Sequence, residues 1–187
     1  MNEGHLEFCA SEDWRRLLHD MILPTALAGV DLGSEVLEIG PGPGFTTDVL
    51  KDRTQSLTAV EIDQALADAL MARLAGTNVL VLVGDATALE FPDAHFSGAA
   101  SFNMLHHIPT VHAQQQALRE VARVLQPGGV LIATDSGYSA GTHLFHEGDT
   151  YNPIEGEAVE KRLLAAGFAS VEVRTYDLGW AATARAA

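Results

Sequence analysis

Short apolar runs recur along this chain, and segments with helical spacing of their apolar residues lie between them. Five runs have the length of buried strands, at residues 35–39, 56–62, 78–83, 98–102 and 129–134. Several are apolar at successive positions, which is typical of strands covered by helices on both faces of a parallel sheet. We therefore expect central strands here, with the run at 78–83 apolar on both faces.

The intervening segments predict helices at residues 46–52, 64–75 and 111–125. Gly76 follows the second of these, and Pro127-Gly128-Gly129 follows the third, and both are helix stop signals. Strands and helices that alternate in this way predict right-handed crossovers. The fold class is therefore α/β, with a doubly wound, mostly parallel sheet.

Both ends of the chain depart from the alternation. At the C-terminal end we expect a helix at 155–166 stopped by Gly167, then strands at 170–177 and 180–185 joined through Leu178-Gly179 as an antiparallel hairpin. Trp180 and the last strand are expected at a sheet edge, where a homodimer contact is a hypothesis.

One amphipathic helix is expected near the N-terminus, at residues 12–28, with Ser11 as its N-cap and Pro24 as a kink or end. Its expected apolar face consists of Trp14, Leu17, Leu18, Met21 and Ile22.

The length and charge of the chain narrow its function classes. A chain of 187 residues predicts one domain, and 25 acidic against 11 basic residues give a formal net charge of −14. An acidic chain without a Lys/Arg-rich run disfavours nucleic acid and anionic membranes as partners. One cysteine, the lack of a membrane-length apolar run and an N-terminus unlike a signal peptide favour a cytoplasmic globular protein.

A glycine cluster, Gly40-Pro41-Gly42-Pro43-Gly44, follows the first strand and precedes a helix. Ligands of open α/β sheets bind beyond the carboxyl ends of the strands, where glycines let the backbone turn tightly and approach a ligand. Glu61 lies 21 residues after Gly40, at the end of the second strand. A carboxylate at this point can accept hydrogen bonds from both hydroxyls of a ribose.

Two classes of ligand use such a layout, and the loop sequence distinguishes them. A dinucleotide needs a third glycine, where this chain has Phe45, and N–H donors for its pyrophosphate, which Pro41 and Pro43 lack. Glu38 just before the loop would repel phosphate. These features favour a ligand with a cationic amine, such as S-adenosylmethionine, and disfavour a nicotinamide-dependent oxidoreductase, which remains the alternative from another enzyme class.

Further motifs follow in order along the chain: Glu38-x-Gly-x-Gly-x-Gly44, Val60-Glu-Ile-Asp63, Gly84-Asp-Ala86, Phe102-Asn-Met-Leu-His-His-Ile108 and Leu125-Gln-Pro-Gly-Gly-Val-Leu-Ile132. From about residue 35 to 185 the chain resembles the class I, Rossmann-like, S-adenosylmethionine-dependent methyltransferases of the small methyltransferase-domain type. The resemblance implies a three-layer αβα fold with seven strands in the order 3-2-1-4-5-7-6, strand 7 being antiparallel.

The resemblance also implies roles for single residues. Glu38 would bind the methionyl amino group, directly or through water, and the loop residues Gly40, Pro41, Gly42 and Gly44 would lie against the cofactor. Glu61 would hold the ribose hydroxyls and Ile62 would lie against the adenine. Asp85 and the Ala86 N–H would contact the adenine edge, and Asn103 would lie beside the methionyl group.

Each of these assignments has a structural alternative. Glu38 and Glu61 could be ordinary carboxylates at strand ends. Asp85 could cap a turn, and Asp63 is expected to cap the following helix.

Catalytic candidates are histidines and one tyrosine. His106 and His107 could act as a general base, although one of the pair is expected to bond the backbone instead. The segment 135–153 is expected to overhang the site and contact substrate through Tyr138, His143, Phe145, His146 and Tyr151. The spacing of His143, His146, Glu147 and Asp149 could suit a metal ion, but we favour a solvated loop and expect no metal site.

The predicted activity is in-line methyl transfer from S-adenosylmethionine to a small molecule, with S-adenosylhomocysteine as product. By analogy with the family, residues 1–30 would form a helical extension over the site, with Trp14 and His19, and residues 31–187 would form the methyltransferase domain. The alternative within this fold is a non-catalytic protein that binds S-adenosylmethionine.

Overall fold

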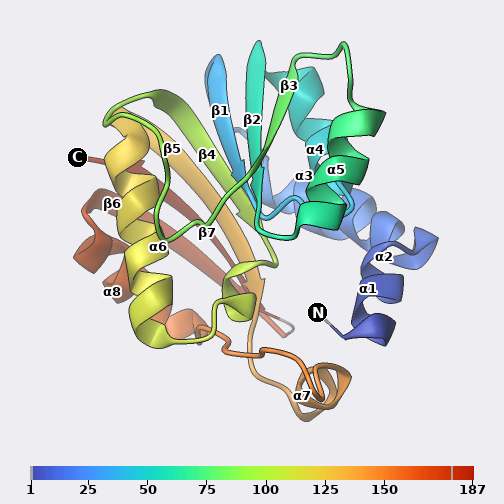
Figure 1. Cartoon of the computed structure of the whole chain (residues 1–187). Helices are drawn as coiled ribbons and strands as arrows, with labels where there is room; N and C mark the ends of the chain where they lie inside the picture. The colour runs from blue at the N-terminus through green and yellow to red at the C-terminus, as the bar shows by residue number, and fades with distance from the viewer. Residues whose placement is uncertain (1, 178) are drawn as a thin grey trace.

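A computed structural model describes residues 2–177 and 179–187, and its centre is one seven-stranded sheet (Figure 1). The strands are β1 (Glu35–Ile39), β2 (Ser56–Glu61), β3 (Val79–Val83), β4 (Phe96–Phe102), β5 (Leu125–Ser136), β6 (Phe168–Tyr176) and β7 (Gly179–Ala186). Their order is β3-β2-β1-β4-β5-β7-β6. The pairs among β1 to β5 are parallel, while β7 is antiparallel to both β5 and β6. The predicted fold class and strand order are confirmed.

Helices cover the two faces of this sheet in separate layers (Figure 1). On one face lie α6 (Val111–Val124) and α8 (Gly156–Ala166), and on the other lie α3 (Leu23–Ala26), α4 (Phe45–Leu50) and α5 (Gln64–Arg73). Side chains of β1 alternate between these layers, so Leu37 packs with the α6 layer while Val36 packs with the α3 layer. The alternation directs Glu38 toward α4.

Local capping explains where several helices begin and end. The Asp63 carboxylate accepts from the backbone N–H groups of Ala65 and Leu66, which confirms its predicted capping role at the start of α5. Gly167 ends α8 in the left-handed conformation, with φ of 113°.

The N-terminal region is more divided than predicted. The expected single helix at 12–28 is instead α2 (Glu12–Leu17), a π-helical turn η1 (Leu18–Ile22) and α3, although Ser11 caps α2 as predicted. Pro24 has no N–H and its ring clashes with the preceding turn, which accounts for the change in hydrogen-bond period before it.

Two further features of the N-terminal region differ from the sequence prediction. Met21 is 61% exposed rather than part of the apolar face. An additional helix, α1 (Glu3–Cys9), precedes α2.

Two predictions made from the residue pattern alone were wrong, whereas the strand order implied by the family resemblance was right at both positions. β3 is an edge strand rather than a central one, and Leu80 is 54% exposed because no helix covers that end of the α6 face. Trp180 is 1% exposed, because β7 lies between β5 and β6 and is not an edge strand. The indole N–H of Trp180 donates to the Ile154 carbonyl at 2.7 Å. Leu178, part of the predicted hairpin turn, lies outside the described residues.

Within residues 2–177 and 179–187, no helix combines the length and apolarity needed to cross a lipid bilayer.

Gly98 allows the close approach of the N-terminal region to the sheet. A Cβ at this position of β4 would lie 2.4 Å from the Leu32 carbonyl oxygen. We expect Gly98→Ala to lower the free energy of unfolding by about 1–3 kcal/mol, since backbone has to move. Gly141→Ala is the control, because its Cβ would meet nothing nearer than 3.9 Å. Urea unfolding measures both, and equal stability of the two variants would contradict the packing argument.

Candidate functional site

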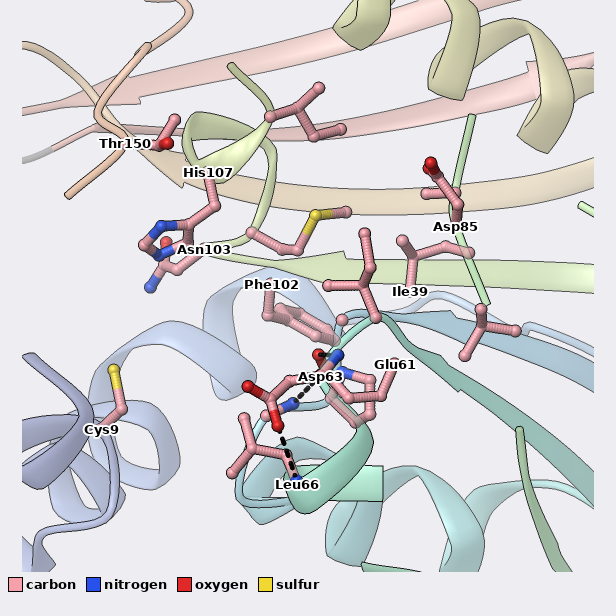
Figure 2. A pocket seen from close by; sticks show the side chains of 18 of the residues that line it. Cys9, Ile39, Glu61, Asp63, Leu66, Asp85, Phe102, Asn103, His107 and Thr150 are labelled. Atoms are coloured by element: carbon pink, nitrogen blue, oxygen red, sulfur yellow. Dashed lines mark hydrogen bonds between the residues drawn. The ribbon is translucent and has the colours of Figure 1, made fainter. Parts of the chain in front are cut away.

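A cavity of about 510 Å³ lies at the carboxyl ends of β1, β2 and β4 (Figure 2). Its wall includes eight of the predicted cofactor-site residues: Gly40, Pro41, Gly42, Glu61, Ile62, Asp85, Ala86 and Asn103. Parallel strands bring these residues together, because their carboxyl ends meet at one edge of the sheet. The size of the cavity is in the range of small-molecule sites.

The glycine loop depends on backbone conformations that glycine adopts readily. Gly40 and Gly42 have φ of 65° and 54°. A Cβ on Gly40 would also lie 2.2 Å from Cγ of Met104. Gly44, with φ of 90°, is different, because a Cβ there would meet Leu70 of α5 and Gly44 is not part of the cavity wall. Gly44 therefore serves the packing of α4 against α5.

Glu61 connects the glycine loop to the end of β2. Its carboxylate is buried, with one oxygen accepting from the Gly42 N–H and the other from the Asp63 N–H, each at 3.0 Å. A carboxylate oxygen accepts more than one hydrogen bond, so Glu61 keeps acceptor capacity toward the cavity that it lines.

Glu38 lies behind the loop and is not part of the cavity wall. It is 1% exposed, and the Thr46 hydroxyl donates to one carboxylate oxygen. The other oxygen, Oε2, has no hydrogen-bond partner among the described residues. Burial raises the pKa of Glu38 to about 7, because the charged form loses its hydration.

The two ends of the cavity differ in chemistry. Asp85 lies at one end in Figure 2, and Asn103 and His107 lie at the other. The Asp85 carboxylate accepts from the backbone N–H and the hydroxyl of Thr87, both at 2.8 Å, so it does cap a turn while also lining the cavity. Ile62 is 70% exposed, although it is a large apolar side chain, and it borders the cavity.

The catalytic candidates separate into different environments. His107 is part of the cavity wall, whereas His106 is buried behind it, with its ring Nδ1 against the Asp135 carboxylate. His106 also donates its backbone N–H to Asp135 at 2.9 Å. Tyr138 and His143 are exposed and lie outside the cavity wall.

The segment 135–153 reaches the cavity through residues other than those predicted. It forms part of the wall through Asp149 and Thr150, and not through its aromatic side chains. His146 is buried and its ring stacks on Tyr151 at 4.4 Å between centroids, so the expectation of a solvated loop was wrong at this position.

Three residues that lie in or near the cavity wall were not identified from the sequence. Cys9 of α1 is part of the wall, and burial raises its pKa to about 11, so the thiol stays protonated. His5 of α1 is buried beside His107, with ring centroids 4.9 Å apart. Asp135 could have been found, because it ends an apolar strand in the same way as Glu61.

A family profile described as the methyltransferase domain matches residues 37–133, about half of the chain. A probable ribosomal RNA small subunit methyltransferase A of Pyrobaculum aerophilum is 36% identical over 127 residues, which cover 61% of this chain and 54% of that protein. A demethylmenaquinone methyltransferase of Renibacterium salmoninarum is 30% identical over 123 residues, 65% of this chain and 47% of that protein. The chain thus matches about half the length of each relative.

Solved structures of similar fold cover more of the chain. The PH0226 protein of Pyrococcus horikoshii superposes with a TM-score of 0.79 at 18% identity, covering 96% of this chain and 94% of that one. The trans-methyltransferase CalH, solved in complex with S-adenosylhomocysteine, has a TM-score of 0.68 at 23% identity, covering 84% of this chain and 52% of that one.

Glu38 is expected to make stability fall as pH rises. Its folded-state pKa of about 7 lies above the ordinary value of 4.5, so its contribution is fully present below about pH 4.5 and is lost as pH rises through 7. The difference in the free energy of unfolding between Glu38→Gln and wild type should therefore shift in favour of the variant by roughly 2–3 kcal/mol as the pH rises from about 5 to 8. Urea unfolding across this range tests it.

The matched control for this measurement is Glu35→Gln. Glu35 is exposed at the other end of the same strand, so that variant should keep the pH dependence of the wild type. A Glu38→Gln protein that also keeps it would show that Glu38 is charged in the folded state throughout the range.

Proposed function

Because the chain belongs to the methyltransferase-domain family and its cofactor is S-adenosylmethionine, we propose that it transfers the methyl group of this cofactor to a small-molecule acceptor. The observation that carries the proposal is the cavity at the strand ends, in which the buried carboxylate of Glu61 fixes the glycine loop and faces the ligand space. The glycine loop, the Glu61 carboxylate and apolar side chains such as Ile62 thus line the same cavity.

Each part of the cofactor has a matching group in this arrangement. Glu61 would accept from the ribose hydroxyls, and the exposed face of Ile62 would cover the adenine. Asp85 and the Ala86 N–H would contact the adenine edge. Asn103, at the opposite end in Figure 2, would lie beside the methionyl group, with Glu38 acting on the amino group from behind the loop.

The reaction asks little of the protein beyond alignment. A bond forms between the acceptor atom and the methyl carbon while the carbon–sulfur bond breaks, and the electron pair stays on sulfur as S-adenosylhomocysteine leaves. Holding the reactants in line can lower the barrier by roughly 7–11 kcal/mol. The N-terminal helices would cover the site, since Cys9 and Trp14 border the cavity.

His107 is better suited to contacting the methyl acceptor than to removing a proton from it. Burial and the neighbouring His106 and His5 lower its pKa to about 2, and so weak a base removes a proton poorly near neutral pH. We therefore propose that His107 positions the acceptor and does not act as its general base.

RNA is the second candidate acceptor, because the relative from Pyrobaculum aerophilum is named as a probable ribosomal RNA methyltransferase. A formal net charge of −14 favours the small molecule, since phosphate binding depends on Lys and Arg to release counterions. A non-catalytic cofactor-binding protein is the third possibility, and turnover distinguishes it.

The test is formation of S-adenosylhomocysteine from S-adenosylmethionine with a panel of small phenols, amines, thiols and quinols, and in parallel with small-subunit ribosomal RNA. We expect turnover with a small acceptor and a KM that changes little between low and moderate salt. Turnover only on RNA, with a KM that rises steeply with salt, would overturn the small-molecule proposal. Cofactor binding without turnover on any acceptor would support the non-catalytic alternative.

Glu61 provides the binding test. Glu61→Ala removes charge-assisted hydrogen bonds worth roughly 1.5–3 kcal/mol, so titration calorimetry should show S-adenosylhomocysteine binding at least about tenfold weaker. Glu61→Gln keeps one acceptor oxygen, so its affinity for S-adenosylhomocysteine should lie between that of wild type and that of Glu61→Ala. Glu35→Ala, an exposed carboxylate on the neighbouring strand, is the control. An affinity unchanged in both Glu61 variants would refute the ribose assignment.

A further inference from the structure

Four histidines converge beside the cavity from three distant parts of the chain. His5 lies in α1, His106 and His107 in the 3-10 turn η3 (Leu105–His107) after β4, and His146 at the end of α7 (Ala140–Phe145). Each histidine offers one ring nitrogen such that these four atoms all lie within 4.8 Å of one another. The shortest separations between ring centroids are 4.1 Å for His106–His107 and 4.3 Å for His5–His146.

Three of these rings are held at Nδ1 by an acceptor outside the cluster. Nδ1 of His106 contacts the Asp135 carboxylate, which is 1% exposed. The corresponding atom of His146 lies 2.7 Å from the Thr142 carbonyl, and that of His5 lies 3.1 Å from the Asp149 carboxylate. An acceptor at Nδ1 places the proton there, which leaves Nε2 with a lone pair. Histidine ligands of metal ions are usually oriented in this way.

Two of the remaining nitrogens are buried without a protein partner. Nε2 of His106 and Nε2 of His146 are inaccessible, and neither bonds any of the described residues. A buried acceptor left unpaired costs roughly 1–3 kcal/mol. Both residues are 4% exposed and His5 is 5% exposed, so the cluster is a built interior site rather than a surface accumulation of histidines.

We propose that His5, His106, His107 and His146 bind one divalent transition-metal ion, with Zn²⁺ as the best match. Four nitrogen donors suit Zn²⁺ and related ions and do not suit Mg²⁺ or Ca²⁺, which take oxygen ligands. Tetrahedral bonds of about 2.0–2.1 Å place nitrogens roughly 3.3 Å apart. The four nitrogens therefore need to close by no more than about 1.5 Å.

Four protein ligands make this a closed, structural site rather than one with an open position for substrate. The ion joins α1 and the end of α7 to the turn after β4. Asn2 already ties α1 to the end of α7, because its side chain donates to the carbonyls of Phe145 and Glu147. His107 belongs both to the cluster and to the cavity wall, so the ion would fix the N-terminal helix at the mouth of the cavity.

The experiment uses the full chain stripped of metal with a chelator and then titrated with ZnCl₂ by calorimetry. We expect one ion per chain and a higher Tm in the presence of the ion, because binding to the folded state alone stabilises it. Titration with Co²⁺ should give the intense visible absorption of a tetrahedral site. No binding of Zn²⁺ by the wild-type chain, or weak binding at several ions per chain, would overturn the proposal.

Single variants connect the binding to these residues. His5→Gln and His146→Gln should each weaken Zn²⁺ binding at least about tenfold, since even loss of an outer-shell partner costs 10–100-fold. His143→Gln is the matched control, because His143 is exposed on α7 three positions before His146 and outside the cluster. Equal Zn²⁺ affinity in all three variants would refute the assignment. Circular dichroism checks folding, and His5→Gln, in the short helix α1 outside the sheet and its covering helices, keeps the test valid if His146→Gln does not fold.

These measurements do not depend on methyl transfer. Zn²⁺ binding without cofactor binding would contradict only the proposed function, and the reverse result would contradict only the metal site.

Discussion

The site depends on one buried carboxylate, that of Glu61. Its two oxygens accept from the backbone N–H groups of Gly42 and Asp63, which belong to the loops after two adjacent strands. This pair of hydrogen bonds fixes the distance between the glycine loop and the end of β2. The cavity forms between them, and a ligand that enters it meets a backbone already in position, so little ordering entropy has to be lost on binding.

Burial of polar groups extends beyond Glu61 and is concentrated at the same edge of the sheet. Glu38, Asp135, His106 and His146 are each at most 4% exposed. Such groups reduce the stability of a fold unless they are paired. Glu38 and the histidines retain unpaired atoms, whereas the rest of the core consists mainly of aliphatic side chains. Buried polar atoms without partners reduce stability, so their presence at this edge of the sheet indicates a role in function.

The acidity of the chain bears on what reaches the cavity. The net charge of −14 repels a polyanion at long range, while a cationic sulfonium cofactor is attracted. The relatives include proteins named for ribosomal RNA and for demethylmenaquinone, acceptors of very different charge. The methyltransferase-domain profile matches residues 37–133, so the N-terminal helices and the segment 135–153 lie mostly or wholly outside the part that the family shares.

The sequence alone determined the fold and identified eight residues that line one cavity, because those features are encoded locally. Apolar runs mark the strands, and because Glu61 ends β2 and Asp85 lies two residues after the end of β3, strand order brings them to one edge. Local sequence patterns could not predict the exposure or packing of a residue where these depend on which other element covers its strand or helix. The exposure of Leu80, the burial of Trp180 and the packing role of Gly44 were decided by neighbours distant in sequence. The histidine cluster is the clearest case, since His5 and His146 lie 141 residues apart and only the docking of α1 against α7 brings their rings together.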